Sequence, residues 1–298
     1  MFGAGASFGV GDVKPGCPPL GKDLYQWLRA TCPTTWGVVS GSLHSAFEND
    51  FEIGMSQAWA SGTIEVQALL VDIGKAFAGF EPIPGGRNRY AELLKTMSTN
   101  RLIDRTVVAT LNYECLLELS ATQLGLSVDY ELGRRNAGYL QLLKPHGSCN
   151  FLLPQNIKFI NSTMSGVGQY YEGPVEAVWP PSKAVAYFAS GQSMPAAMSL
   201  FAPGKPTPVA KGLVDNLRKA WREACQSAEV IAIIGVRPIW ADAHVWDPII
   251  ASRSDVWYVG DDQSCGAIQA RFDRTILLLG HTFEDAIGPM SRLLGILA

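Results

Sequence analysis

Short runs of apolar residues recur along the chain, and each ends in glycine or a polar side chain. The run Thr106–Thr110 is too short for a helix, and its β-branched residues suit a strand buried on both faces of a parallel sheet. Similar runs predict strands at Glu229–Val236, Val256–Val259 and Thr275–Leu279, and a shorter strand at Ser127–Tyr130. The pattern therefore predicts several buried strands rather than one long apolar segment.

Apolar residues spaced three or four apart predict helices between these strands. The predicted helices are Gly21–Ala30, Ser42–Ala60, Gly62–Phe80, Tyr90–Met97, Cys115–Leu124, Lys211–Ser227, Val245–Ser252 and one that begins near Phe283. In the helix after Thr110, Glu114 and Glu118 are expected to face solvent. Because strands and helices alternate, the predicted fold class is α/β, with a doubly wound, mainly parallel Rossmann-like sheet.

The regular pattern is interrupted twice, and both interruptions are predicted to be insertions into one domain that covers residues 1–298. The Rossmann-like core is assigned to about 1–30, 100–150 and 209–298. A helical insertion is predicted at about 40–98. The segment at about 151–208 is rich in Pro, Gly, Ser and Asn, and is predicted to be an irregular insertion or a lid over the site.

Composition narrows the classes of function. The chain is 47% hydrophobic with a net charge of −3, which gives a large core and no long-range attraction for nucleic acid or an anionic membrane. No apolar run reaches the ~20 residues of a spanning helix, and no secretory signal is recognisable. The six cysteines form no C-x-x-C pair, so no zinc ribbon is expected. We therefore expect a cytoplasmic protein that binds no metal, does not associate with a membrane and does not contact nucleic acid directly.

Candidate chemistry gathers where predicted strands end. The chain opens with GAGAS at Gly3–Ser7, whose small residues would let backbone N–H groups approach a phosphate. Asn112 and Gly235 follow two strands, Gly260 and Asp261 follow a third, and His146 follows an apolar run that stops at Lys144-Pro145. Since the carboxyl ends of parallel strands share one edge of a sheet, this arrangement predicts a nucleotide site at that edge.

Three other side chains compete for a chemical role. Cys115 and Cys149 lie near Asn112 and His146, but a thiol needs a lowered pKa to react, and buried, inert thiols are expected. His244 is expected to be structural.

The acidic cluster of Glu48, Asp50 and Glu52 lacks further ligands at metal-binding spacing and is interpreted as a solvated surface.

Five segments resemble motifs of the sirtuin-like superfamily, in the same order and over nearly the whole chain. They are GAGAS at 3–7, TLNYE at 110–114, KPHGS at 144–148, IIGVRPIWADAHV at 233–245 and VGDD at 259–262. The resemblance implies a Rossmann-like fold and binding of NAD.

The chain also departs from the zinc-bearing deacylases of that superfamily. It lacks their two cysteine pairs and their Asp-Phe-Arg segment, and its PPLGKDLYQWL stretch looks more like the zinc-less sirtuin-like NADase modules of bacterial antiviral defence systems. Where that group often has Gly-Tyr-Ser, this chain has Gly235-Val236-Arg237. Arg237 could replace the lost hydroxyl with charge-assisted hydrogen bonds.

The resemblance also implies roles for individual residues. Asn112 would hold the ribose hydroxyls or position the attacking water, and His146 would be the general base, since its ordinary pKa near ~6.5 suits neutral pH. Asp261 would bind the adenosine ribose. The residues expected to hold NAD are Gly3, Ala4, Gly5, Ala6, Ser7, Gly235, Val236, Arg237, Asp242, Gly260 and Asp261.

The function expected from these features is hydrolysis of NAD+ to nicotinamide and ADP-ribose without a metal, in bacterial antiphage defence by NAD depletion. An NAD-dependent protein deacylase and a non-catalytic sensor of NAD or ADP-ribose are the alternatives. Because no large trigger domain fits in the chain, activation is expected to need a partner protein or a homo-oligomer.

Overall fold

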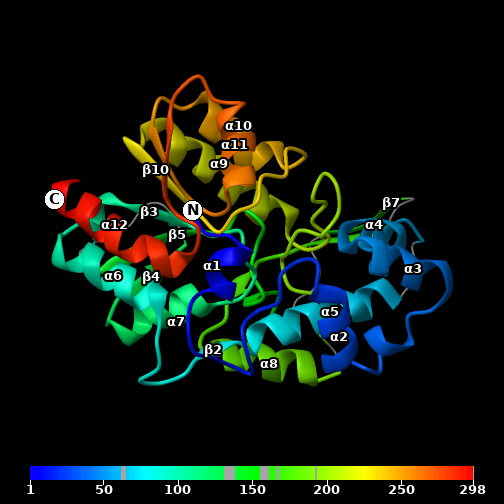
Figure 1. Ribbon diagram of the computed structural model, residues 1–298. Helices are drawn as coiled ribbons and strands as arrows, with labels where there is room; N and C mark the ends of the chain where they lie inside the picture. Colours follow the sequence, from blue (N-terminus) through cyan, green and yellow to red (C-terminus); the bar gives the residue numbers. More distant parts are fainter. Residues whose placement is uncertain (62–64, 131–137, 155–160, 166–167, 192, 298) are drawn as a thin grey trace.

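Two three-stranded parallel sheets lie on either side of the first residues of the chain (Figure 1). This computed structural model describes residues 1–61, 65–130, 138–154, 161–165, 168–191 and 193–297. One sheet has the order β3-β5-β4 and the other β10-β11-β12. The strands are β3 (Val107–Ala109), β4 (Ser127–Asp129), β5 (Tyr139–Leu143), β10 (Val230–Ile234), β11 (Asp255–Val259) and β12 (Ile276–Gly280).

Phe2 joins the two sheets into one. It forms parallel bridges to Thr110, just after β3, and to Ile234 in β10. Its N–H donates to Ala109 O at 2.8 Å, and Ile234 N donates to Met1 O at 2.9 Å. The order β4-β5-β3-Phe2-β10-β11-β12 therefore reverses direction at Phe2, which is the switch point where open α/β sheets bind ligands.

Helices cover both faces of this sheet. One face packs against α6 (Arg89–Thr99), α7 (Leu116–Gln123) and α12 (Phe283–Leu297), where Phe2 meets Tyr90 of α6 with ring centroids 5.1 Å apart. The other face packs against α9 (Lys211–Ser227), α10 (Ala243–Ala251) and α11 (Asp262–Gln269).

Neighbouring strand residues alternate between the two cores, as in Val108 and Ala109 or Ile233 and Ile234. Because both faces are covered, the central strands β3 and β10 are apolar throughout. The prediction of an α/β fold with parallel strands is thereby confirmed.

A helical layer lies beside the sheet (Figure 1). It contains α2 (Leu24–Thr31), α3 (Gly41–Asn49), α4 (Phe51–Ser61), α5 (Glu65–Ala78) and α8 (Pro181–Ala189). Stacked aromatic rings fill its centre, among them Trp36 on Phe51 with centroids 5.6 Å apart. The predicted helical insertion at about 40–98 also included most of α6, but α6 packs on the sheet and not in this helical layer.

The single helix predicted at 42–60 is two helices, because Asp50 interrupts it. Its backbone is extended, and its Oδ1 accepts from Ile53 N at 3.0 Å, which caps the start of α4. The first residues of the helix predicted from Gly62, 62–64, lie outside the described residues. Three helices were not predicted: α1 (Ala4–Phe8), α8 and α11.

The segment predicted as a lid is in contact with the core. Its antiparallel pairs are β6 (Phe151–Leu152) with β9 (Glu176–Ala177) and β7 (Asn161–Ser165) with β8 (Gly168–Glu172). Met198 forms a bridge to Gly147, next to His146. Residues 155–160, 166–167 and 192 of this segment lie outside the described residues.

Four short elements complete the described structure: β1 (Val13–Lys14) paired with β2 (Glu81–Pro82), and the 3-10 helices η1 (Trp36–Val38) and η2 (Ile103–Arg105). In the described ranges, none of the helices is long and apolar enough to cross a membrane.

Candidate functional site

The predicted strand-end residues lie at one edge of the sheet. Gly3, Asn112 and Gly235 follow three neighbouring parallel segments, which are Met1–Phe2, β3 and β10. His146 follows β5, and Gly260 follows β11. The parallel register brings these residues to the carboxyl edge on both sides of the switch point.

Glycine is required where the first loop meets the loop after β10. Gly5 N donates to Gly235 O at 3.0 Å, and Gly235 has a φ of +62°. A Cβ added to Gly235 would lie 2.2 Å from Ala6 N. No side chain fits in this contact, so Gly235 holds the glycine-rich loop against the sheet.

Several N–H groups of that loop already have acceptors. Gly3 N donates to Ile234 O at 3.0 Å, and Ala6 N donates to Gly3 O at 2.9 Å. Ala4 is exposed and begins α1, where an N–H has no acceptor within the helix. Among the five predicted phosphate-binding residues, Ala4 therefore has the N–H best placed for a ligand.

Asn112 is bonded to the glycine-rich loop. Its side chain is 9% exposed, and its Nδ2 donates to Gly3 O at 3.0 Å and to Ser7 Oγ at 2.8 Å. These bonds use both hydrogens of the amide, so Oδ1 is the group that a ligand would meet. The asparagine thus ties the loop to the end of β3.

Ser7 is the centre of a buried polar network. Besides its bond from Asn112, its Oγ lies 2.8 Å from Tyr90 Oη and 2.5 Å from Glu114 Oε1. The other Glu114 oxygen accepts from Leu116 N at 2.6 Å. Burial raises the pKa of Glu114, and the bond from Ser7 and the charge of Lys144 act against this rise.

The prediction that Glu114 and Glu118 face solvent is wrong. Glu114 is 3% exposed, and Glu118 and Lys144 are completely buried. Lys144 Nζ lies 2.8 Å from Glu118 Oε1 and donates to Glu114 O at 2.7 Å. Burial alone would lower the pKa of Lys144, but Glu118, Cys115, Cys149 and Glu114 together raise it above its ordinary value, so this lysine stays charged. The physical reason for the error is that β5 brings a cation beneath α7.

His146 is buried at the same edge and faces a second histidine. Its Nε2 lies 3.0 Å from His244 Nε2. Burial lowers the pKa of His146 well below its ordinary value, and the positive charges of Lys205 and Arg218 add to this effect. Burial also lowers the pKa of His244, to about 4. Both imidazoles are therefore neutral at neutral pH.

A charged cluster surrounds the histidine pair, and sequence reasoning found only Asp242 as a site residue. Arg218 Nε donates to Pro145 O at 3.2 Å, and its Nη2 donates to Ser199 Oγ at 2.8 Å. Glu52, which was interpreted as part of a solvated surface, pairs with the buried Lys205 of this cluster. Burial raises the pKa of Asp242, which is 6% exposed. No short motif could have revealed this cluster, because its members come from α4, α9 and two loops.

The remaining predicted residues lie further along the edge. Val236 is buried, and its carbonyl accepts from Tyr258 Oη at 3.0 Å. Arg237 is exposed. Asp261 is exposed and caps α11, where it accepts from Ser264 N at 2.7 Å and Ser264 Oγ at 2.8 Å. These bonds lower the pKa of Asp261, so it is a fixed carboxylate beside Gly260.

The two cysteines near the site are buried, as expected. Cys115 and Cys149 are buried, with their Sγ atoms 3.8 Å apart, and all six cysteines are free. Burial raises the pKa of the Cys115 thiol well above its ordinary value. A thiolate nucleophile is therefore disfavoured at this position.

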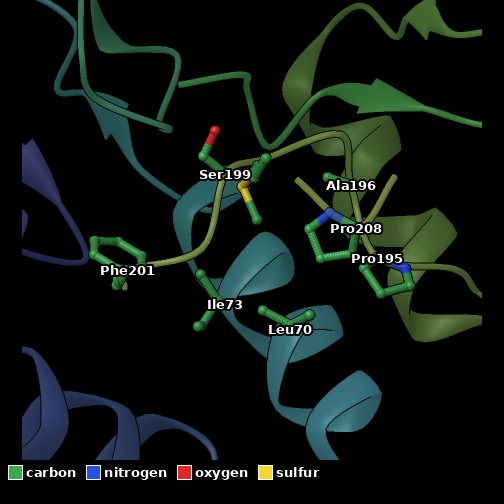
Figure 2. A pocket seen from close by; sticks show the side chains of 8 residues that line it. Leu70, Ile73, Pro195, Ala196, Ser199, Phe201 and Pro208 are labelled. Atoms are coloured by element: carbon green, nitrogen blue, oxygen red, sulfur yellow. The ribbon is translucent and has the colours of Figure 1, made fainter. Parts of the chain in front are cut away.

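One small cavity lies beside the segment that bonds to His146 and Arg218, and a larger cleft lies at the amino edge of the sheet. Figure 2 shows the first, an apolar pocket between α5 and the segment around Ser199, with Leu70 and Ile73 below it. Its volume of about 10 Å³ is the space of one water molecule. A second cleft of about 580 Å³ lies at the amino ends of β3 and β10.

No group of three or more His, Cys, Asp or Glu side chains in the described residues could hold a metal ion. In comparisons with known proteins, no family model and no curated protein matched this chain.

Proposed function

We propose that this protein is an NAD+ glycohydrolase, which cleaves the bond between nicotinamide and ribose to give nicotinamide and ADP-ribose. The observation that carries the proposal is the position of His146, a buried and uncharged base, at the edge where Asn112 is bonded to the glycine-rich loop. The resemblance to zinc-less sirtuin-like NADases supports the same reaction.

The reaction needs positioning more than a strong nucleophile. As the bond from C1′ to the nicotinamide nitrogen breaks, its electron pair leaves with nicotinamide and positive charge builds on the ribose. A water oxygen then bonds to C1′ and loses a proton to a base. In this proposal Asn112 Oδ1 accepts from a ribose hydroxyl or the attacking water, and His146 takes the proton.

The proposed role requires one tautomer of His146. The Leu111 backbone raises the pKa of His146 against the larger effect of burial. With the ring hydrogen on Nδ1, Nε2 is the acceptor in the contact with His244. His244 then donates to His146. Substrate or water has to displace this N–H before His146 accepts a proton.

One feature favours a second candidate, a protein that binds NAD or ADP-ribose without cleaving it. His146 Nε2 is paired with His244. If this bond persists with NAD bound, His146 cannot take a proton from the attacking water.

Incubation of the pure protein with NAD+, with nicotinamide and ADP-ribose measured separately, tests the proposal. We expect the two products in equal amounts. Tight NAD binding with no product, over a range of protein concentrations, would indicate the sensor instead. Turnover that depends strictly on an acyl-lysine peptide would indicate a deacylase.

The cellular role that we propose, antiphage defence by NAD depletion, rests on the resemblance alone. An activating partner or assembly of several copies of this chain belongs to the same proposal. A rise in specific activity with protein concentration would distinguish assembly from a partner.

A further inference from the structure

The turn that carries His146 is held by a second segment of the chain, Ala197–Lys205, which we call the strap. Ser199 N donates to His146 O at 2.8 Å. The residue after His146, Gly147, has a φ of +81°, and a Cβ added to it would collide with Ala197 O. The two backbones are therefore in direct contact, and the strap fixes the turn from one side.

One guanidinium group joins the strap to the turn. Arg218, on α9, donates from Nε to Pro145 O at 3.2 Å, directly before His146. Its Nη2 donates to Ser199 Oγ at 2.8 Å and to Lys205 O at 3.1 Å, and both acceptors belong to the strap. The Arg218 side chain is 16% exposed. A planar guanidinium makes these three bonds at once because its donors have fixed directions, whereas a lysine ammonium is a single point at the end of a flexible stem.

The strap has an unusual backbone conformation where it meets Arg218. Lys205 has a φ of +45°, in the left-handed region that residues other than glycine rarely adopt. In this conformation its carbonyl accepts from Arg218, and its ammonium pairs with Glu52 of α4. Such backbones persist where the surrounding structure fixes them, and they cluster at functional sites. The end of the strap is thus held by two separate helices.

Ser199 connects this arrangement to the segment of Asn112. The Ser199 carbonyl accepts from Tyr113 Oη at 2.8 Å, and Tyr113 directly follows Asn112 in the chain. The same residue bonds to His146 through its N–H and to Arg218 through its hydroxyl. Arg218 therefore acts at the point where the segments of both proposed catalytic side chains meet.

Arg218 also brings a positive charge to the histidine pair. Burial is the largest cause of the lowered pKa of His146 and of His244, and the charges of Lys205 and Arg218 lower both further. The other charged or titratable groups of this cluster are Asp215 of α9, Glu52 of α4, Asp242 before α10, and Tyr113. The bonds of the guanidinium and its charge thus favour the same state, a neutral imidazole in a fixed turn.

We propose that Arg218 is a positioning residue, which fixes the turn of His146 by clamping Pro145 O to the strap. It acts through the backbone on either side of His146. Its place in catalysis rests on the proposed function, in which His146 Nε2 has to meet the proton of the attacking water. Since a displacement of about 1 Å can lower a rate ~10²-fold, loosening of this turn should appear in kcat.

Three substitutions separate the bonds of Arg218 from its charge. Arg218→Met removes both, Arg218→Lys keeps the charge without the planar fork, and Arg222→Met, at an exposed position one turn further along α9, is the matched control. Hydrogen exchange at the Ser199 amide, which donates to His146 O, reports on the turn without NAD turnover. We expect exchange at least about tenfold faster in both Arg218 variants than in Arg222→Met, with the core amides of β10 and β11 as the measure of global unfolding.

NAD+ turnover is the second measurement. In Arg218→Met, kcat should fall roughly 10- to 100-fold while KM stays within about threefold of the wild type, and in Arg218→Lys the fall in kcat should be smaller. The acid limb of kcat/KM should move to higher pH in Arg218→Met and keep its wild-type position in Arg218→Lys, because only the methionine variant removes the charge. A residue with a merely structural role would shift neither kcat nor this limb in a folded variant.

The two measurements separate failure of this inference from failure of the proposed function. Unchanged exchange at Ser199 in folded Arg218→Met, or faster exchange there with wild-type kcat, would overturn the positioning role. Faster exchange at Ser199 in a protein whose wild type releases no nicotinamide would uphold the clamp and refute the proposed function. Arg218→Lys, which keeps the buried charge, carries the same test if the methionine variant does not fold.

Discussion

His146 and His244 face each other through their Nε2 atoms at a distance of 3.0 Å. Only one of the two nitrogens can carry the shared hydrogen while both rings are neutral. Since burial lowers the pKa of both imidazoles, the pair is held in its uncharged form, which is the form a general base needs.

The pH dependence of activity follows from this pair. A base with a lowered pKa stays neutral at more acid pH, so kcat/KM should be constant from about pH 8 to about pH 6 and fall only well below 6.5. His244→Asn removes one of the influences that lower the pKa of His146, so the acid limb should move to higher pH. Initial rates across the pH range, with the exposed His281→Asn as control, check this. An acid limb near 6.5 in the wild type would contradict it.

Stability should depend on pH in the same direction. A histidine with a folded pKa below its unfolded value binds protons more tightly when unfolded, so stability is complete above about pH 6.5 and is lost as pH falls toward about 4. Because His244 is partly exposed, solvent screening reduces its share of this loss to about 1–2 kcal/mol. Urea unfolding at pH 7.5 and 4.5 should show a smaller loss in His244→Asn than in the wild type, while a loss equal to that of the wild type would refute this explanation.

Gly235→Ala should disrupt the glycine-rich loop. The added Cβ would meet Ala6 N at 2.2 Å, so the loop has to shift, at a cost of about 1–3 kcal/mol beyond the ~1 kcal/mol of a positive φ. Gly85→Ala is the matched control, because Gly85 also has a positive φ of +74° but no atom near its Cβ position. Thermal unfolding and NAD titration of both variants measure the difference. Equal losses of stability would show that the contact is unimportant.

The buried ion pair of Lys144 and Glu118 should behave as a coupled unit. Lys144→Met leaves a buried carboxylate without its cation and should cost about 3–5 kcal/mol of unfolding free energy. The double variant Lys144→Met, Glu118→Leu should be more stable than that single variant, because it removes both charges. Chemical denaturation of the wild type, Lys144→Met, Glu118→Leu and the double variant gives the coupling energy between the two side chains. Additive losses would contradict the pairing.

The sheet was predictable from the sequence because its central strands are buried on both faces. Runs such as Val230–Ile234 carry no polar residue, and the residue after each run is a glycine or a polar side chain. The edge that brings Gly3, Asn112 and Gly235 together follows from parallel strand order alone. Local pattern and tertiary structure agree in these strands.

The buried charges could not be predicted in the same way. Glu118 lies on what a helical pattern describes as an exposed face. Its burial is made possible by Lys144, which directly follows a strand further along the chain, and by Tyr130, whose Oη donates to Glu118 Oε1 at 3.1 Å. Arg218 and Lys205 reach His146 from separate segments. Long-range partners of this kind leave no local signal. Lys144 directly after an apolar strand was the nearest hint.

The position of Asp261 fits two different roles, and the sequence does not distinguish between them. A carboxylate at a strand end suits a ribose hydroxyl, and it equally suits the start of a helix, which is the bond the structure shows with Ser264. Both uses depend on the same position at the strand end. Its ribose role stays a prediction.

Nicotinamide release by the wild type, Asn112→Ala and His146→Ala, measured side by side, tests the central claim most directly. Both variants should bind NAD+ within a few-fold of the wild type and lose roughly 10²-fold or more in kcat, with His281→Asn as the matched control that retains activity. Thermal unfolding shows that each variant is folded. Nicotinamide release by folded Asn112→Ala and His146→Ala at the wild-type rate, or its absence from the wild type at every protein concentration, would contradict the account.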